Sequence, residues 1–209
     1  LHERGVLFSL DAIQTLGAFS TRVEHVDFLS ADAHKWLLGP LAIGIVYVAR
    51  RNFERCHPTL IGAWNVHSPN FITQDDIAFT GTAQRYEPGV LNTTGMYGML
   101  AAIDLLLECG LDAVSARILD VRDYLHRALE ELGFESLSPS PDEPLRSGIL
   151  TVRHPAHDSA QLFAAFERAK ITASLRNTRS GDAWLRFSPH FYNTREEMDR
   201  IVATLKSAM

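Results

Sequence analysis

The stretch DFLSADAHKWLLGP, residues 27–40, gathers chemically active side chains at the end of an apolar run. Asp32, His34 and Lys35 follow that run and precede a tryptophan and a Gly-Pro turn. A lysine amine can serve catalysis as a nucleophile or a base, and a histidine beside it can bind an anion. Because desolvating an ammonium ion is costly, lysine is rarely buried without a partner or a role. The stretch therefore predicts a functional role for Lys35.

Two other stretches carry polar side chains at places that suit a ligand. Asp11 and Gln14, in DAIQ, close the apolar run 5–12, and Arg186 lies in RFSPHFYNT. In parallel sheets, ligands gather outside the carboxyl ends of the strands. Asp11 and Lys35 both fall at such ends, so we expect their strands to be neighbours and their side chains to share one edge of the sheet.

The elements that position these residues can be predicted from the hydrophobic pattern. Apolar runs that end in an acid are typical of parallel strands buried on both faces, whereas a β-branched run soon after a Gly-Pro turn favours an antiparallel strand. A polar segment with little periodicity indicates long loops. We therefore expect two parallel strands over 5–12 and 26–33, an antiparallel strand over 43–50, loops over 51–89, and helices over 93–108 and 111–132.

A change of composition marks the C-terminal part of the chain. Residues 137–148 are rich in proline and serine, and after them strands alternate with helices over 159–170 and 194–209. The last helix opens with Thr194 and Glu197, the spacing of a capping box. The pattern predicts an α/β protein with one domain over 1–110, a linking helix over 111–136, and a small α/β domain with an antiparallel sheet over 137–209.

Composition excludes several classes of partner. The net charge of −5 and the lack of a Lys/Arg run argue against nucleic acid, and no apolar stretch approaches a bilayer span. Cys56 and Cys109 lack metal-ligand spacing, so we expect no metal site and a reduced, cytoplasmic setting. The chain opens without methionine and close to a strand, which indicates a start inside an existing domain, with N-terminal processing as the alternative.

Four stretches together resemble one known family. DAIQT, DFLSADAHKWLLGPLAIGIVY, YEPGVLN and RFSPHFYNTREEMDRIV are similar, in this order, to the class V aminotransferase family of pyridoxal-phosphate enzymes. That family includes cysteine desulfurases, isopenicillin-N epimerase-like proteins and kynureninases. The resemblance covers nearly the whole chain but only the C-terminal half or more of a family member. It implies the C-terminal part of a fold type I transferase, with an incomplete, mostly parallel sheet of the large domain plus the small domain.

The resemblance also implies roles for single residues toward pyridoxal 5'-phosphate. Lys35 would form the Schiff base, Asp11 would pair with the pyridine nitrogen, and Gln14 would donate to the phenolic oxygen. His34 would help to hold the phosphate, and Arg186 would bind the substrate carboxylate through its planar fork. The alternatives are a solvated loop lysine, an aspartate that forms a turn, a surface glutamine, a structural histidine and a strand arginine paired with a local acid.

This chain departs from the family pattern at several positions. Asp32 stands where desulfurases usually carry a serine that reaches the phosphate, so Asp32 is not a clear ligand. Val90 stands where a threonine reaches the phosphate of the partner subunit, and Asn92 or Thr93 would have to replace it. Residues 171–186 contain no cysteine, although desulfurases carry their nucleophile in this region. Desulfurase activity is therefore disfavoured.

The function implied is that of an amino-acid-transforming enzyme, acting by Schiff base exchange and Cα deprotonation with Lys35 as the base. Aminotransfer, epimerisation and elimination share those steps, and the full-length protein would be a homodimer. We expect these 209 residues alone to bind pyridoxal phosphate weakly. The alternative is a noncatalytic, truncated family member with a structural or interaction role. A nucleotide-binding domain is disfavoured because no Gly-rich loop follows a strand.

Overall fold

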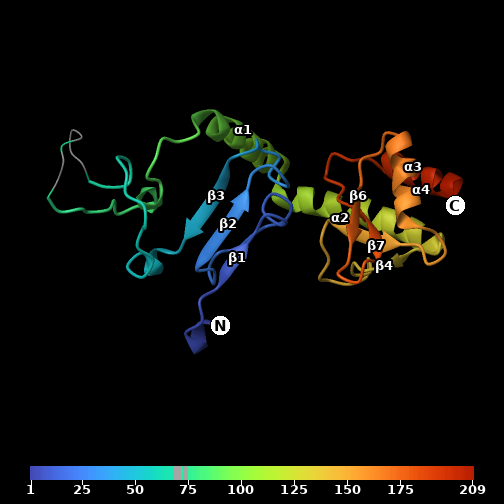
Figure 1. The fold of residues 1–209 in the computed structure, drawn as a ribbon, viewed down its shortest axis with the longest axis horizontal. Coiled ribbons are helices and arrows are strands. Elements are labelled where there is room, and N and C mark those ends of the chain that lie inside the picture. The colour runs from blue at the N-terminus through green and yellow to red at the C-terminus, as the bar shows by residue number, and fades with distance from the viewer. Residues whose placement is uncertain (68–71, 73–74) are drawn as a thin grey trace. The chain divides into compact units, whose positions relative to one another are not determined.

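A computed structural model describes the chain from Leu1 to Met209 except residues 68–71 and 73–74. Part of the predicted loop segment 51–89 therefore lies outside the described residues. The chain divides into two compact units, Leu1–Glu108 and Cys109–Met209, and each is described by itself (Figure 1).

The first unit is built on a three-stranded sheet in the order β1-β2-β3. β1 (Ser9–Asp11) pairs in parallel with β2 (Phe28–Asp32), which pairs antiparallel with β3 (Gly44–Val48) (Figure 1). The predicted directions of all three strands are confirmed. Each strand is shorter than its apolar run, although β1 and β2 both include the aspartate near the end of the run, Asp11 and Asp32. The unit also contains α1 (Thr93–Cys109) and the short 3-10 helices His2–Arg4, Arg50–Asn52 and Ala83–Tyr86.

The two faces of this sheet differ. Leu29 and Ala31 of β2 are buried together with Ala12 and Val26, and they form a hydrophobic cluster of the unit. On the other face Ser30 is exposed, as are the residues that pair with it, Asp11 of β1 and Val46 of β3. The expectation that these strands are buried on both faces is therefore wrong for the described residues. The open face carries the side chains that end β1 and β2.

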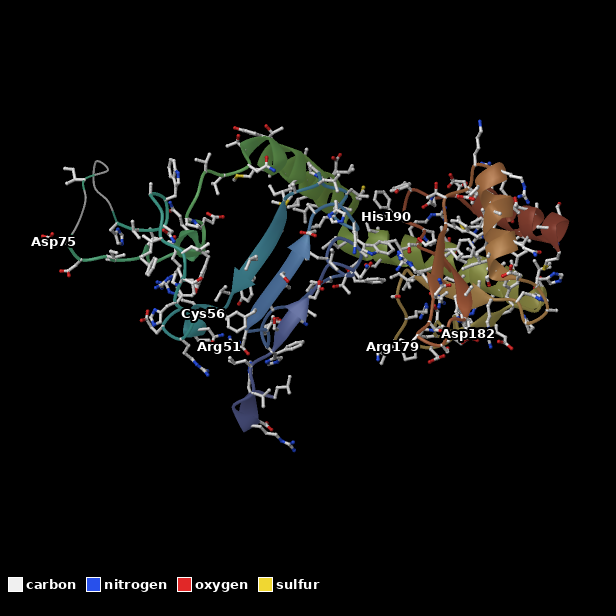
Figure 2. The ribbon with its side chains drawn as sticks, viewed as in Figure 1. Arg51, Cys56, Asp75, Arg179, Asp182 and His190 are labelled. Carbon is white, nitrogen blue, oxygen red and sulfur yellow. The ribbon has the colours of Figure 1, made fainter. Side chains whose placement is uncertain are left out.

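Asp27 anchors the N-terminal end of β2. Its carboxylate, nearly inaccessible to solvent, accepts hydrogen bonds from the backbone N–H of Phe8 at 2.8 Å, the Asn52 amide at 2.9 Å and His2 Nε2 at 2.9 Å. Arg51 adds two guanidinium contacts of 2.9 and 3.1 Å and lies near this end of the sheet in Figure 2. The Phe8 N–H, followed by Asn52, lowers the pKa of the Asp27 carboxyl well below its usual range.

We therefore expect Asp27 to make a contribution to the free energy of unfolding that is lost in acid. Because its folded pKa lies below its unfolded value, the contribution is present above about pH 4 and is lost as pH falls toward the folded value. We expect Asp27→Asn to be less stable than the parent at neutral pH and to lose less stability on acidification. Urea midpoints measured from neutral to acidic pH test this, with the exposed Asp104→Asn on α1 as the control. Parallel pH profiles for parent and Asp27→Asn would contradict it.

The second unit has a four-stranded antiparallel sheet in the order β4-β5-β7-β6. Its strands are β4 (Glu135–Ser136), β5 (Leu150–Arg153), β6 (Ser174–Asn177) and β7 (Ala183–Phe187), and its helices are α2 (Leu111–Glu131), α3 (Ser159–Arg168) and α4 (Arg195–Ala208). The capping box of Thr194 and Glu197 is confirmed. The helix predicted as a link corresponds to α2, and its side chains Val121, Leu125 and Leu129 belong to this core.

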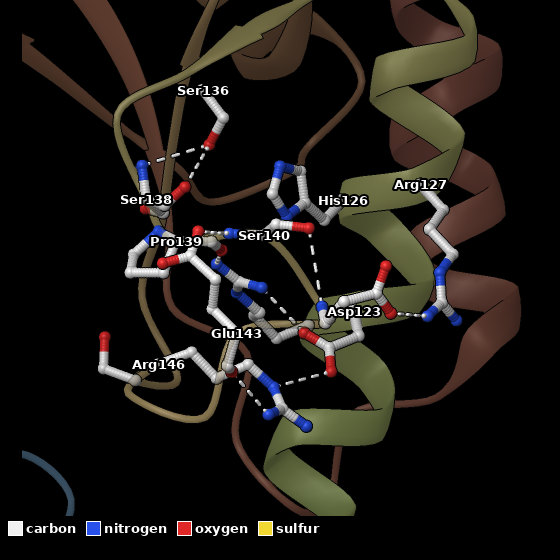
Figure 3. Close-up of polar contacts among 12 residues, drawn as sticks. Asp123, His126, Arg127, Ser136, Ser138, Pro139, Ser140, Glu143 and Arg146 are labelled. Atoms are coloured by element: carbon white, nitrogen blue, oxygen red, sulfur yellow. Dashed lines mark hydrogen bonds and ion pairs between the residues drawn. The ribbon is translucent and has the colours of Figure 1, made fainter.

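The proline-rich segment 137–148 is tied to α2 by polar contacts (Figure 3). Arg146 Nε lies 3.0 Å from Asp123 Oδ2, and its Nη1 donates to the Glu143 carbonyl at 2.9 Å. The fully buried Arg122 bonds Asp123 at 2.7 Å and also donates to the Pro139 carbonyl. Buried charges that are paired in this way cost much less than unpaired ones. The segment is therefore an integral part of the second unit.

Candidate functional site

The parallel pair β1–β2 brings two of the predicted site residues to one edge of the sheet. Asp11 is the last residue of β1 and pairs in register with Ser30, and Lys35 lies three residues beyond the end of β2. Parallel neighbours end at the same edge, so both residues lie where ligands of such sheets gather. The expectation that the two strands are parallel neighbours is confirmed.

Lys35 lies in a tight turn that is anchored by apolar neighbours. The Gly39 N–H donates to the Ala33 carbonyl at 2.8 Å, and the Leu38 N–H donates to the Lys35 carbonyl at 3.0 Å. Ala33 and Trp36 are buried on either side, whereas Lys35 is exposed. The apolar residues therefore hold the turn against the core, and the lysine amine remains accessible.

Asp11 is fixed by a short-range contact. Its Oδ1 accepts the Ile13 N–H at 3.1 Å, an Asx turn that restricts the side chain. The open face beside it is hollowed to about 350 Å³, and Asp11, Ser30, Asp32 and Gly44 contribute to the lining. That volume falls within the usual range of small-molecule sites, about 300–1,000 Å³. Lys35 is not part of this lining.

His34 and Asp32 face each other at the end of β2. His34 Nδ1 lies 3.8 Å from Asp32 Oδ2, and both side chains are partly accessible to solvent. A protonated His34 therefore has a carboxylate partner on its own strand end. This contact gives Asp32 a partner other than a phosphate. An acid at this position is compatible with a bound phosphate only if its carboxylate faces such a partner.

Asn92 caps α1. Its Oδ1 accepts the Gly95 N–H at 2.9 Å, which satisfies one of the unpaired donors of the first turn, and its Nδ2 donates to the Ala42 carbonyl at 3.2 Å. Both polar atoms of the side chain thus take part in local contacts. The structure gives Asn92 a capping role that sequence reasoning missed, although a polar residue directly before a helical pattern is the usual signal for it.

Gln14 and Gly17 join the turn after β1 to the turn that carries Lys35. Trp36 Nε1 donates to Gln14 Oε1 at 3.0 Å. Gly17 has φ +94°, and a Cβ at this position would lie 2.4 Å from the Trp36 carbonyl oxygen. The sequence pattern predicts a role for Gln14 but none for Gly17 or Trp36. The available signal was a glycine shortly after the first strand and an aromatic residue shortly after the second.

Gly17 is expected to be intolerant of a side chain. In Gly17→Ala the new Cβ meets backbone atoms, which cannot move aside as a flexible side chain would, and the positive φ adds strain. We expect a loss of about 1–3 kcal/mol in the free energy of unfolding. Urea denaturation measures it, with Gly89→Ala as the control because nothing lies within 4 Å of a Cβ at Gly89. Equal midpoints for the two variants would show that the close approach does not restrict the turn.

Arg186 lies in the second unit, on β7. It is opposite Thr151 of β5 and Ser174 of β6, and its side chain is half-buried. Its Nε is buried without a hydrogen-bond acceptor among the residues that the structure describes. Burial, together with the nearby Arg176, lowers the pKa of the guanidinium. A cation with an unused buried donor suits an anionic ligand.

The described part of the chain contains no group of three or more His, Cys, Asp or Glu side chains arranged to hold a metal ion. None of its helices combines the length and the apolar character that crossing a bilayer requires.

Known proteins resemble the chain over almost its whole length. A family model described as aminotransferase class-V matches residues 1–201. Isopenicillin N epimerase of Streptomyces clavuligerus is 29% identical over 97% of the chain and 52% of its own length. A probable cysteine desulfurase of Pyrococcus abyssi is 24% identical over 98% of the chain and 52% of its own length. The apo cysteine desulfurase of Thermococcus onnurineus superposes with a TM-score of 0.89 at 23% identity, over 99% of the chain and 54% of its own.

The fold is that of fold type I pyridoxal-phosphate-dependent transferases, matched over about half of their length. The chain belongs to the class-V aminotransferase family. It spans about half the length of the curated relatives that it matches.

Proposed function

We propose that the protein containing this chain is a pyridoxal-phosphate-dependent enzyme that acts on an amino acid, of the aminotransferase, epimerase or lyase type. The observation that carries the proposal is the delivery of Asp11 and Lys35 to one edge of the sheet by β1 and β2, in a chain of this family. A neighbouring structure, a C-DES variant, has glycine covalently linked to its PLP cofactor.

The side chains at this edge fit the cofactor by their chemistry. Asp11 is an exposed carboxylate with only Oδ1 tied to the backbone, which suits a protonated ring nitrogen. Lys35 supplies an accessible amine, Gln14 an amide donor, and His34 an imidazole for an anionic group. When bound, pyridoxal phosphate supplies an aldehyde and a ring that withdraws electrons from the substrate Cα.

Each residue then has a defined task. Asp11 would keep a proton on the ring nitrogen, because a carboxylate stabilises the adjacent cation. Lys35 would hold the cofactor through Nζ, and its free amine would take the proton from the substrate Cα. His34 is assigned to the phosphate, and Arg186 to the substrate carboxylate through its planar guanidinium. Asn92 would reach the phosphate only through the second N–H of its Nδ2, because its other contacts are made to Gly95 and Ala42.

The turn between β6 and β7 supports an activity other than sulfur transfer. Asp182 accepts the Ser180 hydroxyl at 2.6 Å and the Thr178 hydroxyl at 3.3 Å, so polar contacts close this turn. Figure 2 shows Arg179 and Asp182 there, and residues 171–186 contain no thiol.

The two cysteines lie in other parts of the chain. The Cys56 carbonyl accepts the Tyr86 hydroxyl at 2.9 Å in the loops of the first unit. The sequence favours a packing role for Cys109 in its helix, but Cys109 is exposed at the end of α1, so that expectation is wrong. Both thiols are free, which agrees with the proposed cytoplasmic setting. We also propose a homodimer, as the resemblance implies.

The proposed function is tested by the absorbance of the full-length protein. We expect a visible band from covalently bound cofactor, and a change of that band on addition of the amino acid that is the substrate. Individual amino acids are screened in turn, and L-cysteine is assayed separately for sulfide release in the presence of a reductant. We expect no sulfide above the level of free cofactor. A protein without the visible band would favour the noncatalytic alternative, and rapid sulfide release would contradict the proposed reaction type.

A further inference from the structure

The contact between Trp36 and Gln14 spans the two strand ends of the candidate site. The indole Nε1 of Trp36 lies 3.0 Å from Gln14 Oε1, and the Trp36 side chain is almost completely buried, with 4% of its surface exposed. Lys35 is the residue directly before Trp36 in the chain. The same turn therefore carries the amine and the group that contacts Gln14.

This contact determines which end of the Gln14 amide faces the site. A glutamine amide has an acceptor end and a donor end of nearly the same shape, whereas an indole N–H can only donate. The atom that faces Trp36 must therefore be Oε1. The NH₂ group of Gln14 is left as the end that can donate to another acceptor.

Packing around the contact fixes it in place. Gly17 lies against the Trp36 carbonyl so closely that a Cβ would overlap it, and the Thr15 and Leu16 N–H groups both donate to the Ala12 carbonyl, at 3.0 and 2.8 Å. Neither turn can shift without disturbing the other. Rotation of the Gln14 amide would also break the hydrogen bond of the buried Trp36 N–H. This opposes rotation, because an unsatisfied buried N–H is costly.

We infer that Trp36 is a positioning residue: its indole N–H holds the Gln14 amide so that the NH₂ group donates to an anionic oxygen of the ligand that Lys35 holds. The inference rests on the proposed function, in which that oxygen is the phenolic oxygen of the cofactor. Trp36 itself does not touch the reacting atoms. Its effect on the ligand passes through Gln14.

The test compares four variants of the full-length protein: Trp36→Phe, Gln14→Ala, the double variant and Gln14→Glu. Trp36→Phe keeps an aromatic ring but removes the N–H, and Gln14→Glu keeps an acceptor for Trp36 but removes the NH₂ donor. We expect Trp36→Phe and Gln14→Ala each to weaken cofactor binding by about 3- to 10-fold, the range of one hydrogen bond. The double variant is expected to lose no more cofactor affinity than the single variant that binds the cofactor less tightly.

A spectroscopic readout separates positioning from a general loss of stability. A hydrogen bond from Gln14 stabilises the ionised phenolic oxygen, so its loss raises the midpoint of the pH titration of the visible band. We expect a rise of about half a unit to one unit in Trp36→Phe, Gln14→Ala and Gln14→Glu. Gln14→Glu is expected to keep the urea midpoint of the parent, because Trp36 retains its acceptor.

Trp184→Phe is the matched control. Trp184 is also buried, but its Nε1 has no acceptor among the described residues, so removing that N–H breaks no hydrogen bond. We expect parental cofactor affinity and titration midpoint. Additive losses in the Trp36/Gln14 pair, or an unchanged titration midpoint in Trp36→Phe, would overturn the inference.

Three further outcomes are decisive. If Trp36→Phe does not fold, the indole N–H resonance of Trp36 in the parent decides: slow hydrogen exchange that becomes fast in Gln14→Ala supports the contact, and fast exchange in the parent refutes it. If the parent binds no cofactor, the proposed function fails whatever the resonance shows. If the parent binds cofactor and Trp36→Phe binds it equally well, only the present inference fails.

Discussion

Replacement of Lys35 by alanine is expected to abolish covalent attachment of pyridoxal phosphate and to lower turnover by about 10²- to 10⁴-fold, the contribution of a positioned general base. The reason is chemical, since alanine offers neither an amine to hold the cofactor nor a group to take the proton. Borohydride reduction followed by peptide mass spectrometry measures the attachment, and steady-state kinetics with the identified substrate measures the turnover.

The position of Lys35 makes this variant informative. Its side chain is exposed, so the substitution leaves the core intact, and we expect the free energy of unfolding to change by less than about 0.5 kcal/mol. The control is Lys206→Ala, because Lys206 is exposed on α4 in the second unit. It should keep both the covalent cofactor and the activity. A reduced cofactor found on Lys170 or Lys206 of the parent would falsify the assignment of Lys35.

The exposure of Lys35 also shows what the sequence could not predict. The pattern placed the lysine correctly after a strand, because an apolar run that ends in polar residues and a Gly-Pro turn has few other solutions. It overestimated burial, because a run such as 26–33 reports a strand but not which of its faces is covered. In the described chain Leu29 and Ala31 face the core, whereas Ser30 and Asp32 face the open side.

The second unit was easier to predict. Its helices carry long amphipathic patterns and its last helix carries a capping box, signals that depend on neighbours in the sequence. The two-residue strand β4 was missed, since a pair such as Glu135–Ser136 is defined only by its hydrogen bonds to Val152 and Arg153. Contacts over such distances along the chain leave little local trace.

The candidate site was predicted in its residue types but not in its supports. Lys35 and Asp11 were found because chemistry at strand ends is unusual and visible in the sequence. Trp36 and Gly17 were missed because their importance comes from one hydrogen bond and one close backbone approach between two separate turns. Asp27 was missed for the same reason, since its donors come from three other segments.

Replacement of Arg186 by glutamine is expected to lower kcat/KM by about 10- to 100-fold, mostly through a higher KM. Hydrogen bonds to charged groups contribute about 1.5–3 kcal/mol, and each 1.4 kcal/mol corresponds to about tenfold. A carboxylate that is bound equally in the ground state and the transition state affects KM rather than kcat. Arg186→Lys keeps the charge but lacks the planar fork, so we expect an intermediate loss. Steady-state kinetics with the identified amino acid measures both.

Stability should respond in the opposite way, and this separates a binding role from a structural one. The buried Nε of Arg186 has no acceptor among the described residues, and burial lowers the pKa of the guanidinium, so the charge is held at a cost in the ligand-free protein. Arg186→Gln should therefore unfold at the parental urea concentration or above it, although it binds substrate more weakly. Arg168→Gln, at an exposed position on α3, is the control for both measurements. A destabilised Arg186→Gln with unchanged KM would mean that Arg186 supports the sheet and not the substrate.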